Sequence, residues 1–255
     1  KLINKANEDL VDCYFAMWVD PDLGCFTDDY VGCDVGRSMA YVYNEDAQDG
    51  QTGTTCTGGV NTYGTRIPAL AIDYFRGPRG PKVFVRNEQT GEILKDANGK
   101  PLLRDPIPQT GELDTLVELG MTSFIYTNNA SVNSPPAATT DPVGQDQQFY
   151  NNIRGLWKTG EAITFGGSGY NPGSRDTVKY VFPDTPERSN GWSMCTSNLP
   201  NGDRRTLQAT GPLILQPSAT NELIIGVVFV PDMDYPCPDI SRLQNSDDIA
   251  QSLFN

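Results

Sequence analysis

The chain has 255 residues, six cysteines, no histidine and a formal net charge of −13. This length buries a sizeable core, as one large β domain or two smaller ones. The acidity makes nucleic acid and anionic membrane surfaces poor partners, and no apolar run is long enough for membrane insertion. The absence of histidine excludes Ser–His–Asp and Cys–His catalysis and removes the commonest transition-metal ligand.

Glycine and proline are frequent, and short apolar runs lie between turn signals, which predicts a mainly β fold. We expect one β-sandwich domain over residues 1–255, jelly-roll or immunoglobulin-like, with long loops, an inserted β-ribbon and one or two short helices. The chain begins as if inside a strand and ends inside a helical pattern without a stop signal. We therefore predict a fragment of a longer polypeptide.

The strands are expected in the following order. Residues 11–19 form an apolar run with aromatic residues, which predicts a strand buried on both faces. A turn signal at residues 7–9 predicts that residues 1–19 form a hairpin. The clearest strand, residues 222–230, is rich in β-branched residues and is bounded by Asn221 and Pro231. The further strands are predicted at residues 38–43, 67–76, 116–127, 177–182, 204–210 and 221–230.

Other segments interrupt this β pattern. Residues 82–104 alternate strand-like pieces with glycine-containing turns and predict the inserted β-ribbon. Residues 131–143 are rich in Ser, Pro, Ala and Thr and predict a surface loop or linker. A short helix is expected within residues 145–158, because apolar residues recur there at helical spacing. Residues 240–255 are expected to start a C-terminal helix.

The seventeen residues from Trp18 to Asp34 hold five aspartates and two cysteines. Clustered carboxylates repel one another unless a cation neutralises them. Calcium takes roughly six to eight oxygen ligands, and it suits carboxylates in a chain without histidine. We predict a structural Ca²⁺ site in this loop, not of the EF-hand type, because Val31 stands where that motif needs glutamate. The candidate ligands are Asp20, Asp22, Asp28, Asp29 and Asp34.

The alternative interpretation of this run is a solvated acidic turn whose aspartates cap backbone amides. A second acidic patch at residues 44–50 contributes ligands, binds a second ion, or is an ordinary loop. Arg204 and Arg205 follow a tight turn and are expected to pair with nearby carboxylates, those of the acidic loop among them.

The cysteines form an even set without a CxxC pair. Disulfides in an exported protein are the expected use, and sequence does not choose among the possible pairings. Cys25 with Cys33 is a plausible local bridge around the acidic loop. The alternative is that several are buried free thiols.

Two other chemistries are open at this point. Paired carboxylates are available for glycosidase-type hydrolysis, although nothing in the sequence singles out one acid. Exposed aromatic residues would make a sugar-binding surface, but aromatic residues of β domains more often lie in the core. The aromatic candidates are Trp18, Tyr30, Tyr63, Tyr170 and Trp192.

Residues 18–34 resemble a W-x-D-x-D-L-G-x-x-x-D-D-Y-V-G-C-D signature found in very large exported proteins of Bacteroidetes. Those proteins usually end in a type IX secretion sorting domain. The resemblance implies an exported, cell-surface or released protein and brings no characterised activity. It continues in the segments 150–158, 164–170, 191–192, 202–205, 211–212, 226–229, 238–251 and 253–254.

These observations together favour a non-enzymatic structural or adhesive segment of an exported bacterial cell-surface or filament protein. Calcium and disulfides are expected to stabilise it outside the cell or on the outer cell surface. Neighbouring domains or subunits of a surface assembly are the expected partners. The alternatives are a carbohydrate-binding module, with glycans as partners, and a carboxylate-dependent hydrolase.

Overall fold

The computed structural model describes residues 1–50, 56, 62–81, 83–84, 103–104, 116–130, 134–200 and 202–254. Strands dominate it. They are β1 (Leu2–Ile3), β2 (Leu10–Val19), β3 (Asp29–Asp34), β4 (Met39–Asn44), β5 (Ala69–Arg76), β6 (Arg79–Pro81), β7 (Val83–Phe84), β8 (Leu103–Arg104), β9 (Leu116–Glu118), β10 (Ser123–Asn128), β11 (Ile163–Thr164), β12 (Thr177–Val178), β13 (Arg204–Leu215), β14 (Thr220–Asn221) and β15 (Ile224–Val230). The helices are α1 (Asp146–Ile153), α2 (Met194–Ser197), α3 (Ser241–Phe254) and a short 3₁₀ helix, η2 (Ala137–Thr139).

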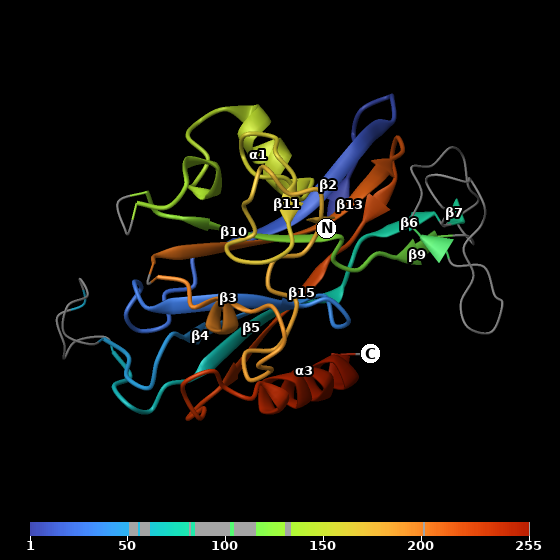
Figure 1. The fold of residues 1–255 in the computed structure, drawn as a ribbon. Coiled ribbons are helices and arrows are strands. Elements are labelled where there is room, and N and C mark those ends of the chain that lie inside the picture. Colours follow the sequence, from blue (N-terminus) through green and yellow to red (C-terminus); the bar gives the residue numbers. More distant parts are fainter. Residues whose placement is uncertain are drawn as a thin grey trace.

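Two antiparallel sheets make up the body of the molecule (Figure 1). One has four strands in the order β15-β5-β4-β3, and the other has three in the order β10-β13-β2. They face each other, since the Tyr74 hydroxyl on β5 donates to the Gln208 carbonyl on β13 at 2.8 Å. Helix α1 packs on the three-stranded sheet, and α3 packs on β5 and β15 of the other (Figure 1). The prediction of a mainly β, sandwich-like fold is confirmed.

The four-stranded sheet is covered on both faces where β3 and β4 lie. Every residue of β4 is buried. On one face of β4, the Tyr41 hydroxyl donates to the Asp184 carbonyl at 3.2 Å, and the Cys195 N–H donates to the Tyr43 hydroxyl at 3.3 Å. The loop around α2 therefore shields that face from water, and a continuous apolar run is what such a strand requires.

Several strand predictions need correction. Residues 1–19 do not form a hairpin, because β1 pairs with β14 instead of β2. Strand β2 is not buried on both faces: it is an edge strand, and Trp18 is 52% exposed. The predicted strand 116–127 is two strands, β9 and β10, and only Thr177–Val178 of 177–182 pairs as β12. The helix predictions within 145–158 and 240–255 correspond to α1 and α3, whereas α2 was not predicted.

The largest revision concerns the acidic run. Its last six residues, Asp29–Asp34, are not a loop but the buried strand β3, which pairs along its length with β4. Of the predicted ribbon 82–104, the described ends pair as antiparallel β7 and β8, and residues 82 and 85–102 lie outside the described residues. Residues 131–133 of the predicted loop also lie outside them.

The structure contains two disulfides, Cys25–Cys56 and Cys195–Cys237, with Cα–Cα distances of 5.6 and 5.7 Å. The predicted Cys25–Cys33 bridge is wrong. Cys33 is a buried free thiol in β3, and the extended strand carries it away from Cys25. No helix in the described part of the chain is both long and apolar enough to cross a membrane.

A candidate cation site of buried carboxylates

The structure distributes the five predicted ligands over three places. Asp20 and Asp22 lie beside Asp203, with side-chain oxygens within 4.8 Å of one another. Asp28 lies in a second group, with Asp49 and the sulfur of Cys25 within the same distance of one another. Asp29, the next residue, is buried beside that second group. The fifth residue, Asp34, lies at the other end of β3.

Asp34 is already neutralised at its own end of the strand. The Arg37 guanidinium contacts its Oδ2 at 2.8 Å, and the Arg37 N–H donates to Oδ1 at 3.1 Å. The Gln244 amide on α3 donates to Oδ2 at 2.9 Å. The structure therefore separates Asp34 from the other four candidates and gives its oxygens partners of their own.

The group of Asp20, Asp22 and Asp203 also has a basic partner. The Arg205 guanidinium contacts Asp20 at 3.0 Å and Asp203 at 2.7 Å. Burial, followed by the charges of Asp20 and Asp203, raises the pKa of Asp22. The prediction that Arg205 pairs with the acidic loop is confirmed, and its guanidinium supplies the positive charge that a cation would otherwise bring.

The remaining carboxylates, Asp28, Asp29 and Asp49, form what we call the Asp28 pocket. They are 3%, 2% and 1% exposed. Arg204 lies close, yet its guanidinium donates to the backbone carbonyl of Asp29 at 2.6 Å and not to a carboxylate. The prediction that Arg204 pairs with carboxylates is thus wrong in detail: within the described residues, backbone carbonyls take its hydrogen bonds.

Backbone amides satisfy part of this pocket. The Gly50 N–H donates to Asp28 Oδ2 at 2.9 Å, and the Leu23 N–H donates to Asp29 Oδ2 at 2.9 Å. The Cys25 N–H donates to Asp49 Oδ1 at 2.7 Å, and the Tyr63 N–H donates to Asp49 Oδ2.

Two oxygens are left over. Asp28 Oδ1 and Asp29 Oδ1 are buried and have no hydrogen-bond partner. A buried, unpaired carboxylate oxygen is costly, because it has lost its water without replacement. Burial, with Asp49 adding its charge, raises the pKa of Asp28 to about 6, and burial raises the pKa of Asp29 well above its usual range.

Local geometry explains why two acidic segments meet here. The β3–β4 pairing sets Asp29 opposite Asn44, so the residues before β3 and those after β4 lie together. Asp49 thus enters from the second acidic patch, 44–50, as one of the sequence interpretations allowed. Gly24 has a φ of +79°, and a Cβ there would collide with the Asp49 carboxylate, so glycine is required for the close approach.

The donor set fits a hard cation better than a soft one. The sulfur of Cys25 is bonded to Cys56 and is not a thiolate, so it is not a ligand of the kind that zinc or copper needs. Carboxylate oxygens remain, and these are ligands that calcium accepts. Asp28 and Asp49 offer carboxylate oxygens within 4.8 Å of each other. Asp29 is buried beside them, and one oxygen each of Asp28 and Asp29 has no hydrogen-bond partner.

The aromatic residues do not all lie on the surface. Tyr30 and Trp192 are buried and Tyr170 is half-buried, whereas Trp18 and Tyr63 are 52% and 44% exposed. The predicted sugar-binding set is therefore reduced to two exposed side chains, Trp18 on β2 and Tyr63 in the loop before β5.

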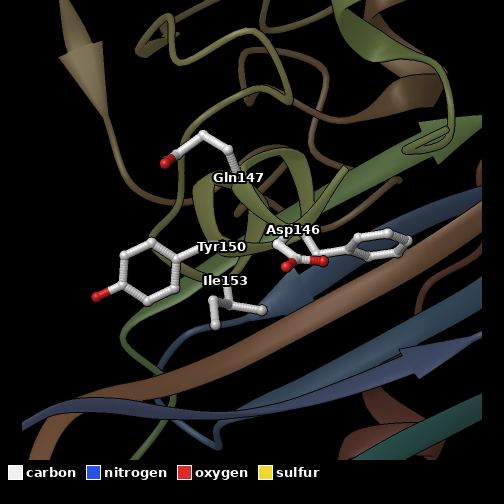
Figure 2. A pocket seen from close by; sticks show the side chains of 5 residues that line it. Asp146, Gln147, Tyr150 and Ile153 are labelled. Atoms are coloured by element: carbon white, nitrogen blue, oxygen red, sulfur yellow. The ribbon is translucent and has the colours of Figure 1, made fainter. Parts of the chain in front are cut away.

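Two cavities bear on hydrolysis. One of about 190 Å³ is lined by two acids, Asp34 and Asp184. Asp184 accepts from Arg188 at 3.1 Å and from the Trp192 N–H at 2.8 Å, so both acids of this cavity are held by donors. The other, of about 520 Å³, lies against α1 and offers a single acid, Asp146, among side chains from one helix (Figure 2).

No family model, curated protein or solved structure matches this chain. The resemblance to exported Bacteroidetes proteins therefore stays a prediction from the sequence.

Proposed function

We propose that this chain is a non-enzymatic structural and adhesive segment of an exported bacterial cell-surface or filament protein, and that Ca²⁺ bound in the Asp28 pocket stabilises it. Asp28, Asp29 and Asp49 are the ligands in this proposal. It keeps two of the five residues predicted from sequence and adds Asp49.

One observation carries the proposal. Asp28 and Asp49 have carboxylate oxygens within 4.8 Å of each other, and the buried Asp29 lies close enough to feel both charges. None of the three has a guanidinium or ammonium group bonded to it among the described residues. Asp28 Oδ1 and Asp29 Oδ1 have no partner at all. Such a cluster opposes folding unless protons or a cation neutralise it.

The two disulfides support the cellular location. They indicate an oxidising, extracellular-type environment. Cys25–Cys56 lies directly beside the Asp28 pocket, because the Cys25 N–H is bonded to Asp49. The cross-link and the ion would then stabilise the same loops, which suits a protein that has to persist outside the cell.

The test is the thermal stability of the chain with intact disulfides, first in a chelator and then with calcium added to millimolar concentration. A ligand that binds only the folded state stabilises by about 2.7 kcal/mol at a hundred times its Kd. We expect the midpoint to rise with calcium in the wild-type chain and not in Asp28→Asn. Asp22→Asn is the matched control, because it removes the same charge from the neighbouring group and should keep the calcium response.

The calcium response of the three chains tests both the presence of the ion and its position. A midpoint that calcium leaves unchanged in the wild-type chain would remove the metal from the proposal. Loss of the response in Asp22→Asn, with retention in Asp28→Asn, would move the site to the group of Asp20, Asp22 and Asp203.

A further inference from the structure

A second pair of buried carboxyls lies between α3 and the four-stranded sheet, and the Asp28 pocket does not include it. On α3, Leu243, Asp247 and Ala250 share one face with Phe254, so an aspartate occupies the middle of an otherwise apolar stripe. On β5, Asp73 stands between Ile72 and Tyr74.

Helix α3 packs against β5 and β15 (Figure 1). The rings of Phe254 and Phe75 lie 5.9 Å apart, and the Gln251 amide donates to the Phe75 carbonyl at 2.9 Å. Arg37 donates to the Asp248 carboxylate through two nitrogens, each at 2.9 Å. These contacts hold the face of α3 that carries Asp247 against the sheet.

Both carboxyls are removed from water. Asp73 is 1% exposed and Asp247 is 2% exposed. The Oδ1 atoms of both residues are buried without a hydrogen-bond partner. Two ionised carboxylates in such a place repel each other and lack compensation, so the ionised pair opposes the docking of α3.

The surrounding charges do not offset this repulsion. Asp34 on β3 and Asp248 on α3 add negative charge to that of Asp73 and Asp247. Arg37, between β3 and β4, is the basic group facing them among the described residues, and its donors are taken by Asp34 and Asp248. Strand β15, the other strand under α3, contains no titratable residue from Ile224 to Val230.

We propose that the Asp73–Asp247 pair makes the docking of α3 depend on a proton: the helix is held tightly while the pair is protonated, and it loosens when both carboxyls are ionised. The pair has no third free carboxylate to complete a calcium site, since Asp34 accepts from Arg37 and Gln244. The inference does not rest on the Asp28 pocket.

The direction follows from the protonation of the folded state. Burial, with the charge of Asp247 second, raises the pKa of Asp73 to about 7; burial, with Asp248 second, raises that of Asp247 to about 6. Because the docked state binds protons more tightly than the undocked state, docking is strongest at acid pH. It weakens as the pH rises from the usual carboxyl range through these values.

The experiment is hydrogen exchange, read by mass spectrometry on peptides that cover residues 241–254 of the disulfide-intact chain. After correction for intrinsic exchange rates, we expect the protection of α3 to fall about tenfold or more between about pH 5 and about pH 8. Asp247→Asn should keep the protection nearly level over this range, and Asp73→Asn should do the same from the sheet side.

Asp248→Asn is the matched control, because it removes the same charge from the neighbouring position of the same helix, and its carboxylate lies at the exposed ion pair with Arg37. It should still lose protection as the pH rises, because burial is the first cause of the raised pKa of both Asp73 and Asp247. Equal protection of the wild-type α3 at both pH values would overturn the proposal. So would an unchanged pH response in both Asp247→Asn and Asp73→Asn, or full restoration of protection at high pH by calcium alone.

Discussion

The Asp28 pocket and the Asp73–Asp247 pair are both sets of buried carboxyls without a bonded base, but they are built differently. In the Asp28 pocket, backbone N–H groups from four residues donate to the three carboxylates. A disulfide closes the same loops. The Asp73–Asp247 pair joins a helix to a sheet, with one carboxyl from each.

This difference decides which ligand each set suits. In the Asp28 pocket the amide donors of Gly50 and Leu23 partly oppose the effect of burial on the pKa of Asp28 and Asp29. Three carboxylates together also supply several of the oxygen ligands that a divalent cation accepts. Two carboxyls at an apolar helix–sheet contact have too few oxygens for such an ion. Protonation of the pair removes its charge without a metal ion. Buried acids of one protein therefore suit different ligands, depending on the backbone groups that surround them.

The largest expected effect comes from removing the cross-link on one side of this comparison. Cys25→Ala with Cys56→Ala opens a loop with a sequence separation of 31, and the chain-entropy model gives a loss of about 3–4 kcal/mol. We also expect the calcium response in thermal melts to disappear, because the cross-link fixes the loop from which the Cys25 backbone N–H donates to Asp49. The double variant of Cys195 and Cys237 should lose similar stability and retain the calcium response. The same calcium response in both double variants would show that the Cys25–Cys56 disulfide does not support ion binding in the Asp28 pocket.

Gly24→Ala should disturb the Asp28 pocket through the backbone. A Cβ at this position meets the Asp49 carboxylate, and the φ of +79° disfavours any L residue. Strain and displacement together should cost about 2–4 kcal/mol in chemical denaturation. Gly64→Ala is the control, since its φ is +62° with nothing within 4 Å, and it should cost only about 1 kcal/mol. Equal losses of stability in Gly24→Ala and Gly64→Ala would show that the contact with Asp49 does not contribute to the effect.

Asp73→Asn tests the other side of the comparison, and its sign depends on pH. The folded-state pKa of about 7 lies above the usual value of 3.8, so ionisation removes stability as the pH rises through this range. The asparagine does not ionise, so at about pH 8 we expect the variant to be more stable by on the order of 2 kcal/mol. At acid pH the difference should shrink or reverse in urea titrations. A constant difference at all pH values would contradict the proton linkage.

The smallest expected effect is at Arg37. Its ion pairs with Asp34 and Asp248 are partly exposed, at 2.8 and 2.9 Å. Arg37→Gln should cost about 1 kcal/mol or less, and added salt should reduce that cost further. The variant also leaves the carboxylates near α3 without their basic neighbour, so the loss should be larger at high pH than at low pH. A loss of stability that does not change with salt concentration would indicate that Arg37 acts through packing and not through its charge.

Much of the β pattern was readable because local signals agreed with the final structure. The apolar runs of β4, β5 and β15, and the helical spacing of α1 and α3, follow from the need to bury one or both faces. The failures occurred where pairing is non-local. Strand β1 pairs with β14, and nothing within residues 1–19 identifies a partner more than two hundred residues away.

The candidate site divides in the same way. The crowding of carboxylates in residues 20–34 and the lack of histidine could be read from composition and spacing, which are properties of the chain. The separation of Asp34 from the group, the entry of Asp49 and the placement of Asp73 opposite Asp247 depend on how the chain folds. A strand points successive side chains to opposite faces and carries them apart, whereas pairing and helix packing bring distant residues together, so the set that shares one ligand is fixed by the fold.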